Sequence, residues 1–307
     1  MSGIKKVGFV GIGRMGYPMA GHLVAAGFEV AVADANPEVV EKFIAEHSAI
    51  AAGSLAELAK SCDVLFTMLP TSEVVRTVVL GDGAGDDCLA EGLKPGAILI
   101  DSSTSNPVHT RALGVEMDKR GARMLDAPVA GGQVFAVDGT LDITVGGEEK
   151  LVETCRPLFE AFGGNIFHCG ALGSGHAMKA LNNFVNASAL VSAVEALAVG
   201  RRFGLDTETM ISSMTAAATG RNNPIEKKVI PHILTRRFAT GMDLGLLAKD
   251  TRITVDMAEA IGAFAPIADR CSALWTEAAE TLGASEDQTV VAKLWEQNND
   301  VTLELGD

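Results

Sequence analysis

The segment 11–16 reads GIGRMG and directly follows the apolar run 7–10. Its GxGxxG spacing is typical of a turn that holds a dinucleotide pyrophosphate. The first glycine allows the tight turn, the second lets the backbone approach the phosphates, and the third lets a helix pack closely on the strand. The pattern alone is common, but its place between a strand pattern and a helix pattern favours a dinucleotide site. The predicted cofactor contacts in this loop are Gly11, Ile12, Gly13, Arg14, Met15 and Gly16.

Asp34 ends the next apolar run, EVAVAD at 29–34. In this position a carboxylate can accept hydrogen bonds from the ribose hydroxyls of the adenosine. The following residues, Ala35 and Asn36, offer no cation for a 2'-phosphate. We therefore predict NAD rather than NADP as the cofactor. The alternative is that Asp34 caps a turn or the following helix.

Two more loops are expected at the cofactor, because ligands of parallel sheets lie beyond the carboxyl ends of the strands. One is MLPT at 68–71, which contains Leu69 and Pro70, and the other is DSSTSNP at 101–107. Ser103 and Thr104 could instead bond turn amides or cap the next helix. Spacing alone does not decide between these two interpretations.

Lys179 and Asn183 stand four residues apart in GSGHAMKALNN, at the start of an Ala- and Val-rich helix pattern. In a helix this spacing places both side chains on one face. For a lone lysine, the ordinary interpretation is an aliphatic stem lying on the surface with the ammonium in water. Asn183 could likewise make an interhelical hydrogen bond in the core.

Short apolar runs alternate with longer amphipathic stretches from residue 5 to about 170, which predicts a parallel sheet with helices on both faces. After residue 171 the pattern is helical only. We therefore predict an α/β Rossmann-type domain over residues 1–168 that binds NAD. An all-α domain should follow over residues 169–307, linked by a long interdomain helix at about 171–201 and contributing the substrate cleft and the oligomer contacts.

A net charge of -14 argues against a nucleic-acid-binding surface or a polybasic membrane patch. It also means that an anionic substrate needs local cations to hold it. No apolar run approaches the roughly 20 residues that span a bilayer, and no secretory signal is evident. Five scattered cysteines without a CxxC pair indicate reduced thiols, so we predict a cytoplasmic protein. The six histidines form no close ligand pair, so no metal is predicted.

Five ordered segments resemble the motifs of the β-hydroxyacid dehydrogenases, which include 3-hydroxyisobutyrate dehydrogenase and tartronate semialdehyde reductase. They are GFVGIGRMGYPMAGHL at the N-terminus, DSST, DAPVAGGQVFAVDGTL at 126–141, GSGHAMKALNN and LLAKD at 246–250. The resemblance implies a catalytic lysine at Lys179 and a substrate-orienting asparagine at Asn183. It also places the substrate-carboxylate loop at Ala130, Gly131 and Gly132, and cofactor contacts at Thr104 and Lys249.

The resemblance also implies how Lys179 would act. Hydride transfer between a carbinol carbon and nicotinamide requires a proton to leave or reach the oxygen, and a side-chain amine can carry it. The pKa of free lysine, about 10.4, is too high for a base at neutral pH. Burial in a cleft beside the positive nicotinamide would lower it toward the roughly 7–8 that general catalysis favours. For Lys249, the alternative is a surface ion pair.

We therefore expect an NAD-dependent oxidoreductase acting on a small 3-hydroxy acid, such as 3-hydroxyisobutyrate, or on its semialdehyde. One departure matters, because the family usually has serine where this chain has Ala130. Because of that departure, the substrate could instead be a larger acid, such as a sugar acid or sulfonate. Residues of the segment GRNNPIEKK would then bind its far end. The residues considered there are Arg221, Asn222, Asn223, Lys227 and Lys228, and the alternative for them is a solvated loop. A non-catalytic dinucleotide-binding module is the third possibility, although such a module is expected to have lost the lysine.

The run ALVSAVEALAV has few polar residues on any face of a helix. A helix that is apolar nearly all round needs cover from several sides. We therefore expect a homodimer or homotetramer, with burial inside one subunit as the alternative.

Overall fold

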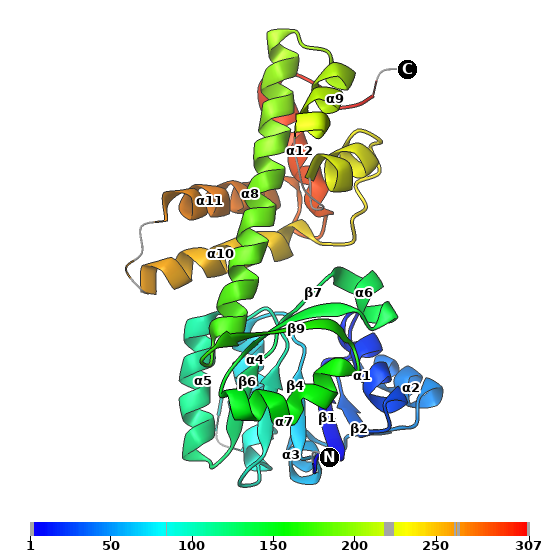
Figure 1. Ribbon diagram of the computed structural model, residues 1–307, viewed down its shortest axis with the longest axis vertical. Coiled ribbons are helices and arrows are strands. Elements are labelled where there is room, and N and C mark those ends of the chain that lie inside the picture. The colour runs from blue at the N-terminus through cyan, green and yellow to red at the C-terminus, as the bar shows by residue number, and fades with distance from the viewer. Residues whose placement is uncertain (1–2, 84, 218–223, 261, 263–264, 306–307) are drawn as a thin grey trace. The chain divides into compact units, whose positions relative to one another are not determined.

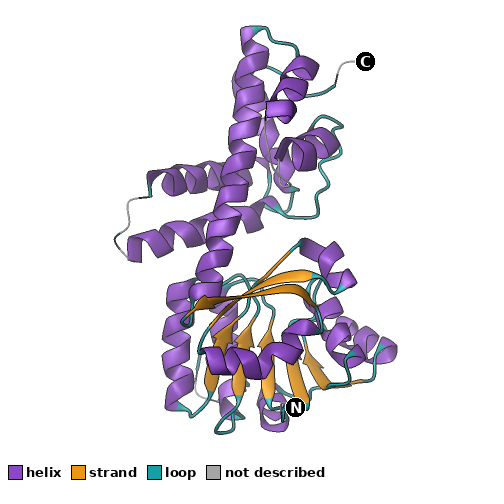
Figure 2. Cartoon of the chain, in the orientation of Figure 1, coloured by secondary structure: helices purple, strands orange, loops and turns teal. Residues whose placement is uncertain are grey.

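The computed structural model describes residues 3–83, 85–217, 224–260, 262 and 265–305. The chain divides into two compact units, Met1–Lys179 and Ala180–Asp307. The first combines a sheet with helices, and the described part of the second consists of helices and loops (Figure 1). Every strand drawn in Figure 2 belongs to the first unit. The assignment of cofactor binding to residues 1–168 and of substrate binding to 169–307 stays a prediction.

The sheet of the first unit has the order β3-β2-β1-β4-β5-β6-β8-β7, with β9 paired to β8. Pairing is parallel from β3 through β6, as predicted, whereas β8 runs antiparallel to both β6 and β7. Between β7 and β8 the chain contains only the short helix Gly132–Asp138, and parallel crossovers need longer connections. The strands are β1 (Lys6–Val10), β2 (Glu29–Ala33), β3 (Ala49–Ala51), β4 (Val64–Thr67), β5 (Ile98–Asp101), β6 (Arg123–Asp126), β7 (Val129–Ala130), β8 (Leu141–Gly146) and β9 (Gly163–Gly170).

Helices cover both faces of this sheet, as the sequence predicts. Alternate residues of β4 separate two cores, with Val64 and Phe66 in one and Leu65 in the other. Side chains of α1, α2, α6 and α7 join the first core, and those of α3, α4 and α5 join the second. The helices of this unit are α1 (Gly16–Ala25), α2 (Pro37–Glu46), α3 (Leu55–Ser61), α4 (Ser72–Leu80), η1 (Leu89–Glu91, 3-10), α5 (Pro107–Lys119), α6 (Gly132–Asp138) and α7 (Glu149–Glu160).

The register aligns the carboxyl ends of the central strands. Val10 of β1 pairs with Ala33 of β2 and with Thr67 of β4. Asp101 of β5 then pairs with Thr67 and with Asp126 of β6. The loops that follow these five strands therefore start side by side at one edge of the sheet.

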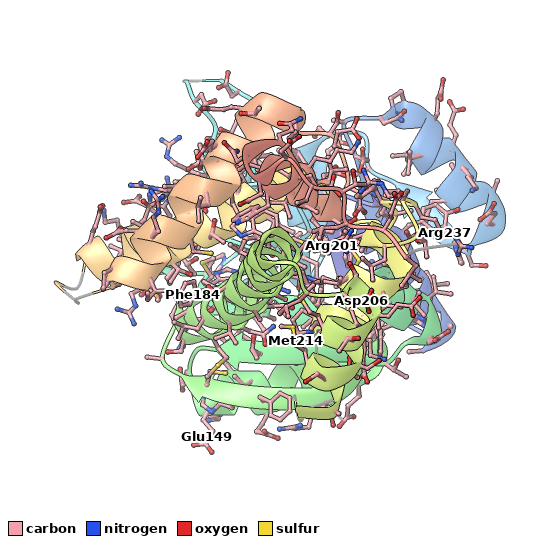
Figure 3. All side chains as sticks on the ribbon, turned by 90° about the horizontal axis from the view of Figure 1, so that it is seen from above. Glu149, Phe184, Arg201, Asp206, Met214 and Arg237 are labelled. Atoms are coloured by element: carbon pink, nitrogen blue, oxygen red, sulfur yellow. The ribbon has the colours of Figure 1, made fainter. Side chains whose placement is uncertain are left out.

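The second unit is built around its own apolar core, in which Trp275 is fully buried. Phe184 of α8 and Met214 of α9 pack against this core, and Asp206 caps α9 by accepting a hydrogen bond from the Thr209 amide at 2.8 Å (Figure 3). The helices are α8 (Ser174–Phe203), which begins in the first unit, α9 (Thr207–Ala217), the π-helix η2 (Ile225–Ile233), α10 (Leu244–Ala260), α11 (Pro266–Leu282), the 3-10 helix η3 (Gln288–Val291) and α12 (Ala292–Asn299).

The long helix predicted at about 171–201 is α8, and it begins three residues later than expected. Gly173 has a φ of +90°, outside the helical region, so the helix starts at Ser174. Among the described residues, no helix combines the length and apolar character that crossing a membrane requires. The location of the protein in the cell stays a prediction.

Candidate active site

The glycine loop between β1 and α1 has two tightly packed positions and one open position. Gly11 has a φ of +90°, and a Cβ there would lie 2.4 Å from the carbonyl oxygen of Met68. A Cβ on Gly16 would lie 1.9 Å from the carbonyl oxygen of Gly11. At Gly13, by contrast, a Cβ would meet no atom within 4 Å. Two glycines therefore allow close packing, and the middle one leaves open space beside the backbone, where phosphates can approach.

The other members of the loop differ in exposure. The side chain of Ile12 is fully buried, so only its backbone can face a ligand. Arg14 is exposed, and Met15 is half-buried against the core. All three were predicted as cofactor contacts, and that assignment stays a prediction.

Asp34 connects the end of β2 to the glycine loop. Its Oδ2 accepts a hydrogen bond from the Ile12 amide at 2.8 Å, and its Oδ1 accepts one from the Asn36 amide at 2.8 Å. The turn-capping alternative is thus present, whereas Asn36, not Asp34, caps α2. Because each carboxylate oxygen has two lone pairs, Asp34 keeps acceptor capacity for ribose hydroxyls. The residues of this edge therefore fit a dinucleotide.

The two further cofactor loops are joined to each other. The Leu69 amide donates to Ser103 Oγ at 2.9 Å, so one serine hydroxyl does satisfy a turn amide. Asn106 caps α5 by accepting from the Val108 amide at 2.8 Å. Thr104 lies half-buried between them, while Pro70 is exposed. The loops containing Leu69 and Thr104 are thus held together by this hydrogen bond.

A buried polar network that includes Asp101 and His176 lies below these loops, and the motifs did not predict a role for His176. Asp101, 1% exposed, accepts from Thr67 Oγ1 at 2.9 Å, from the Ser103 amide at 3.0 Å and from Ser105 Oγ at 2.7 Å. His176, also 1% exposed, lies 3.7 Å from Asp101 through its Nε2 atom. The signal that could have indicated the network is a charged residue that directly ends a buried apolar run, as Asp101 and Asp126 do.

Asp126 fixes the beginning of α8. Its Oδ1 accepts from the Gly173 amide at 2.6 Å, and its Oδ2 accepts from the His176 amide at 2.7 Å. These amides are among the donors that a helix N-terminus leaves without an intrahelical partner. A carboxylate from the end of β6 therefore caps the helix that carries Lys179, and charge favours it there.

The predicted substrate loop follows Asp126 directly. Ala130 ends β7, and the next two residues have positive φ, +120° at Gly131 and +77° at Gly132. Both glycines are exposed and Ala130 is half-buried. Their backbone is therefore accessible, as a loop that binds a carboxylate through amides requires.

Lys179 lies half-buried on α8, one helical turn after His176. Asn183, 8% exposed, follows one turn later and donates through Nδ2 to Asp250 Oδ2 of α10 at 2.7 Å. The interhelical hydrogen bond considered from the sequence is therefore present. It uses one amide hydrogen, and the side chain has another hydrogen and an acceptor oxygen.

Lys249 forms an ion pair with its neighbour, with 2.8 Å between Lys249 Nζ and Asp250 Oδ1. The ion-pair alternative is thus observed, although the pair is largely buried, with side-chain exposures of 27% and 6%. Asp250 links Lys249 and Asn183 within the second unit. The predicted contact of Lys249 with the cofactor stays a prediction.

The segment considered for a larger substrate is described only in part. Arg221, Asn222 and Asn223 lie outside the described residues, and Lys227 is exposed. Lys228 of η2 is half-buried and donates to Gln288 Oε1 at 2.9 Å. Burial lowers the pKa of Lys228 to about 8, although nearby Asp287 acts in the opposite direction. Across the described part of the chain, no group of three His, Cys, Asp or Glu side chains is arranged to hold a metal ion.

Two family models together match most of the chain. Residues 6–170 match the NAD binding domain of 6-phosphogluconate dehydrogenase. Residues 173–295 match a domain described as the NAD-binding of NADP-dependent 3-hydroxyisobutyrate dehydrogenase.

Individual proteins are similar over nearly the whole length. The NAD-dependent L-serine dehydrogenase of Pseudomonas aeruginosa is 33% identical, over 95% of this chain and 98% of its own. The 2-(hydroxymethyl)glutarate dehydrogenase of Eubacterium barkeri is 32% identical, over 98% of each chain. The solved 3-hydroxyisobutyrate dehydrogenase of Mycobacterium tuberculosis, with L-serine, has a TM-score of 0.84 and is 31% identical, over 95% of this chain and 99% of its own.

Proposed function

The chain belongs to the β-hydroxyacid dehydrogenase family of nicotinamide-dependent oxidoreductases, and on that premise we propose that it oxidises a small 3-hydroxy acid, or reduces the semialdehyde, with Lys179 transferring the proton. The observation that carries the proposal is the cap on α8. Asp126 ends β6, precedes the predicted substrate loop and holds the first turn of the helix that bears Lys179. The cofactor loops begin at the same edge of the sheet.

In this proposal each group has one task. When bound, the nicotinamide ring supplies the hydride acceptor. Lys179 Nζ takes the hydroxyl proton as the hydride leaves the carbinol carbon, and returns a proton to the oxygen in the reverse direction. Such positioned proton transfer typically contributes about 100- to 10,000-fold in rate. Asn183 orients the reacting oxygen, and the backbone of 130–132 holds the substrate carboxylate.

We assign NAD as the cofactor because Asp34 is an acidic residue at the end of β2, the position from which a carboxylate typically binds the adenosine ribose. Its carboxylate would accept from the ribose hydroxyls and would repel the phosphate. The exposed Ala35 and Asn36 supply no compensating cation. The remaining cofactor contacts are proposed at the glycine loop, Leu69, Pro70, Thr104 and Lys249.

A second candidate substrate is a larger acid that carries another anionic group, a sugar acid or sulfonate. Two observations favour it. Ala130 lacks the serine hydroxyl usual in the family, and Lys228 places a half-buried amine in the second unit. A non-catalytic module is disfavoured because Lys179 and Asn183 are both present.

We further propose a homodimer or homotetramer. Three apolar side chains on the N-terminal half of α8 are exposed in the single chain, namely Met178 at 46%, Leu181 at 42% and Val185 at 64%. Contact with a second copy would remove this apolar surface from water.

The test is the initial rate of NAD and NADP reduction with a panel of 3-hydroxy acids, for the wild type and for Lys179→Met. We expect NADH formation with at least one small acid and a fall of three or more orders of magnitude in the variant. Preference for a sugar acid or sulfonate would instead support the second candidate. Equal rates in the two proteins would remove Lys179 from the chemistry.

A further inference from the structure

His176 is the point at which three separate parts of the first unit meet. Its backbone amide donates to Asp126 at 2.7 Å, at the base of the predicted substrate loop. Its ring Nε2 lies 3.0 Å from the carbonyl oxygen of Ser103, in the cofactor loop. Its ring Nδ1 lies 2.7 Å from Thr110 Oγ1, in the first turn of α5. The residue itself belongs to the first turn of α8.

The bond to Ser103 places a hydrogen on one ring nitrogen. A carbonyl oxygen can only accept, so Nε2 must carry a hydrogen. Ser103 in turn accepts from the Leu69 amide through its own hydroxyl, at 2.9 Å. One ring hydrogen therefore ties both cofactor loops to the start of α8.

Such a network is stiff because none of its bonds can be exchanged for water without opening the fold. Asp126 is fully buried, and the ring Nδ1 of His176 lies 3.8 Å from its carboxylate. Leaving any of these buried groups without its partner costs free energy, so the network favours one geometry. Lys179 follows His176 by one helical turn, and its position relative to the cofactor loops therefore depends on this geometry.

We infer that His176 is a positioning residue for Lys179, which acts by fixing the distance between the first turn of α8 and the Ser103 carbonyl. The inference rests on the proposed function, since it gives Lys179 the proton transfer. His176 itself touches no reacting atom. A misplacement of about 1 Å at a reacting group can lower a rate by roughly 100-fold, which sets the expected size of the effect.

Three substitutions separate the two ring bonds. In His176→Gln the amide nitrogen can reach the place of Nε2, so the bond to Ser103 is kept. In His176→Asn the amide nitrogen reaches only the place of Nδ1, so the Thr110 bond is kept and the Ser103 bond is lost. His176→Leu fills the volume with neither bond. Val152→Ala is the control, because Val152 is fully buried on α7 in the core on the other face of the sheet.

The experiment measures kcat, KM, the deuterium isotope effect of the carbinol hydrogen and the NADH dissociation constant, together with Tm. We expect kcat to fall about 10- to 100-fold in the Asn and Leu variants, with a larger isotope effect on kcat and NADH affinity within about threefold of wild type. His176→Gln should restore kcat to within about threefold. Val152→Ala should lower Tm while leaving kcat per bound NADH and the isotope effect unchanged.

The outcomes separate the inference from the proposed function. Equal kcat and isotope effect in the Gln and Asn variants would overturn the role of His176, even if the Leu variant does not fold. Lys179→Met is measured in the same assay. If it keeps wild-type activity the proposed function fails, whereas if it is inactive while Gln and Asn behave alike only the positioning role fails.

Discussion

Single residues of the site acquire their properties from partners that are distant in the sequence. His176 bonds Thr110, 66 residues away, and Ser103, 73 residues away. No local pattern encodes such pairs, so the sequence motifs led to Lys179 and Asn183 and gave His176 and Asp126 no role. Asp34 is a different case. It was predicted as a ligand contact, and it also accepts hydrogen bonds from the backbone amides of Ile12 and Asn36.

Lys228 provides a prediction at the same scale. Burial lowers its pKa from 10.5 to about 8. Between these pH values the unfolded chain binds a proton that the folded chain does not, so the free energy of unfolding should rise with pH there. Allowing for partial exposure, the rise is about 1–2 kcal/mol. Urea unfolding of wild type and Lys228→Met from pH 7.5 to 10.5 should show this rise as the difference between the two proteins, because the thiols of Cys62 and Cys155, whose pKa burial raises, affect both alike.

Lys227 supplies the matched control for that measurement. It is the exposed neighbour on the same π-helix, so Lys227→Met should reproduce the pH dependence of the wild type. Parallel curves for all three proteins would show that Lys228 keeps its proton in the folded state. A Lys228 that stays charged would then support the second candidate substrate, the larger acid with another anionic group.

At the scale of elements, the glycine loop joins a strand to a helix through two close contacts and one open position. Gly13→Ala meets no atom within 4 Å, so stability should change by less than about 0.5 kcal/mol. The added methyl would nevertheless stand where the pyrophosphate approaches, and NAD should bind at least about tenfold more weakly.

Gly16→Ala, in contrast to Gly13→Ala, should lower the stability of the fold. Its Cβ would lie 1.9 Å from the Gly11 carbonyl oxygen, so α1 must move away from β1. Overpacking of this kind typically costs about 1–3 kcal/mol of stability. Urea unfolding and NADH fluorescence titration of both variants would measure the contrast. Equal losses of stability in the two variants would contradict it.

The order of strands and helices could be predicted because apolar periodicity is local, and because Asn36 and Asn106, each followed by a proline, mark helix starts. The direction of a strand could not be predicted in this way, because an alternating apolar pattern is the same for parallel and antiparallel pairing. The antiparallel pairing of β8 was therefore not predicted. The predicted start of α8 is three residues too early. The sequence pattern allows Gly173 inside a helix, whereas its φ of +90° places it outside the helical region.

At the scale of the whole molecule, the net charge of -14 acts against the chemistry that the site is proposed to perform. A hydroxy acid anion approaches a surface of like charge, and in the proposed site Lys179 and the amides of 130–132 would attract it. Screening is weak at low salt, because the Debye length is about 30 Å at 0.01 M and about 8 Å at 0.15 M. Repulsion over the molecule should therefore slow the encounter at low ionic strength.

We accordingly expect kcat/KM for a monoanionic hydroxy acid to rise about two- to threefold between 0.01 and 0.15 M ionic strength, at saturating NAD, while kcat stays constant. The methyl ester of the same acid is the control, because it lacks the charge and should show no such rise. Initial rates over a series of salt concentrations, repeated with a second salt, would measure both. A kcat/KM that falls with salt for the acid alone would mean that cations near the site outweigh the charge of the whole chain.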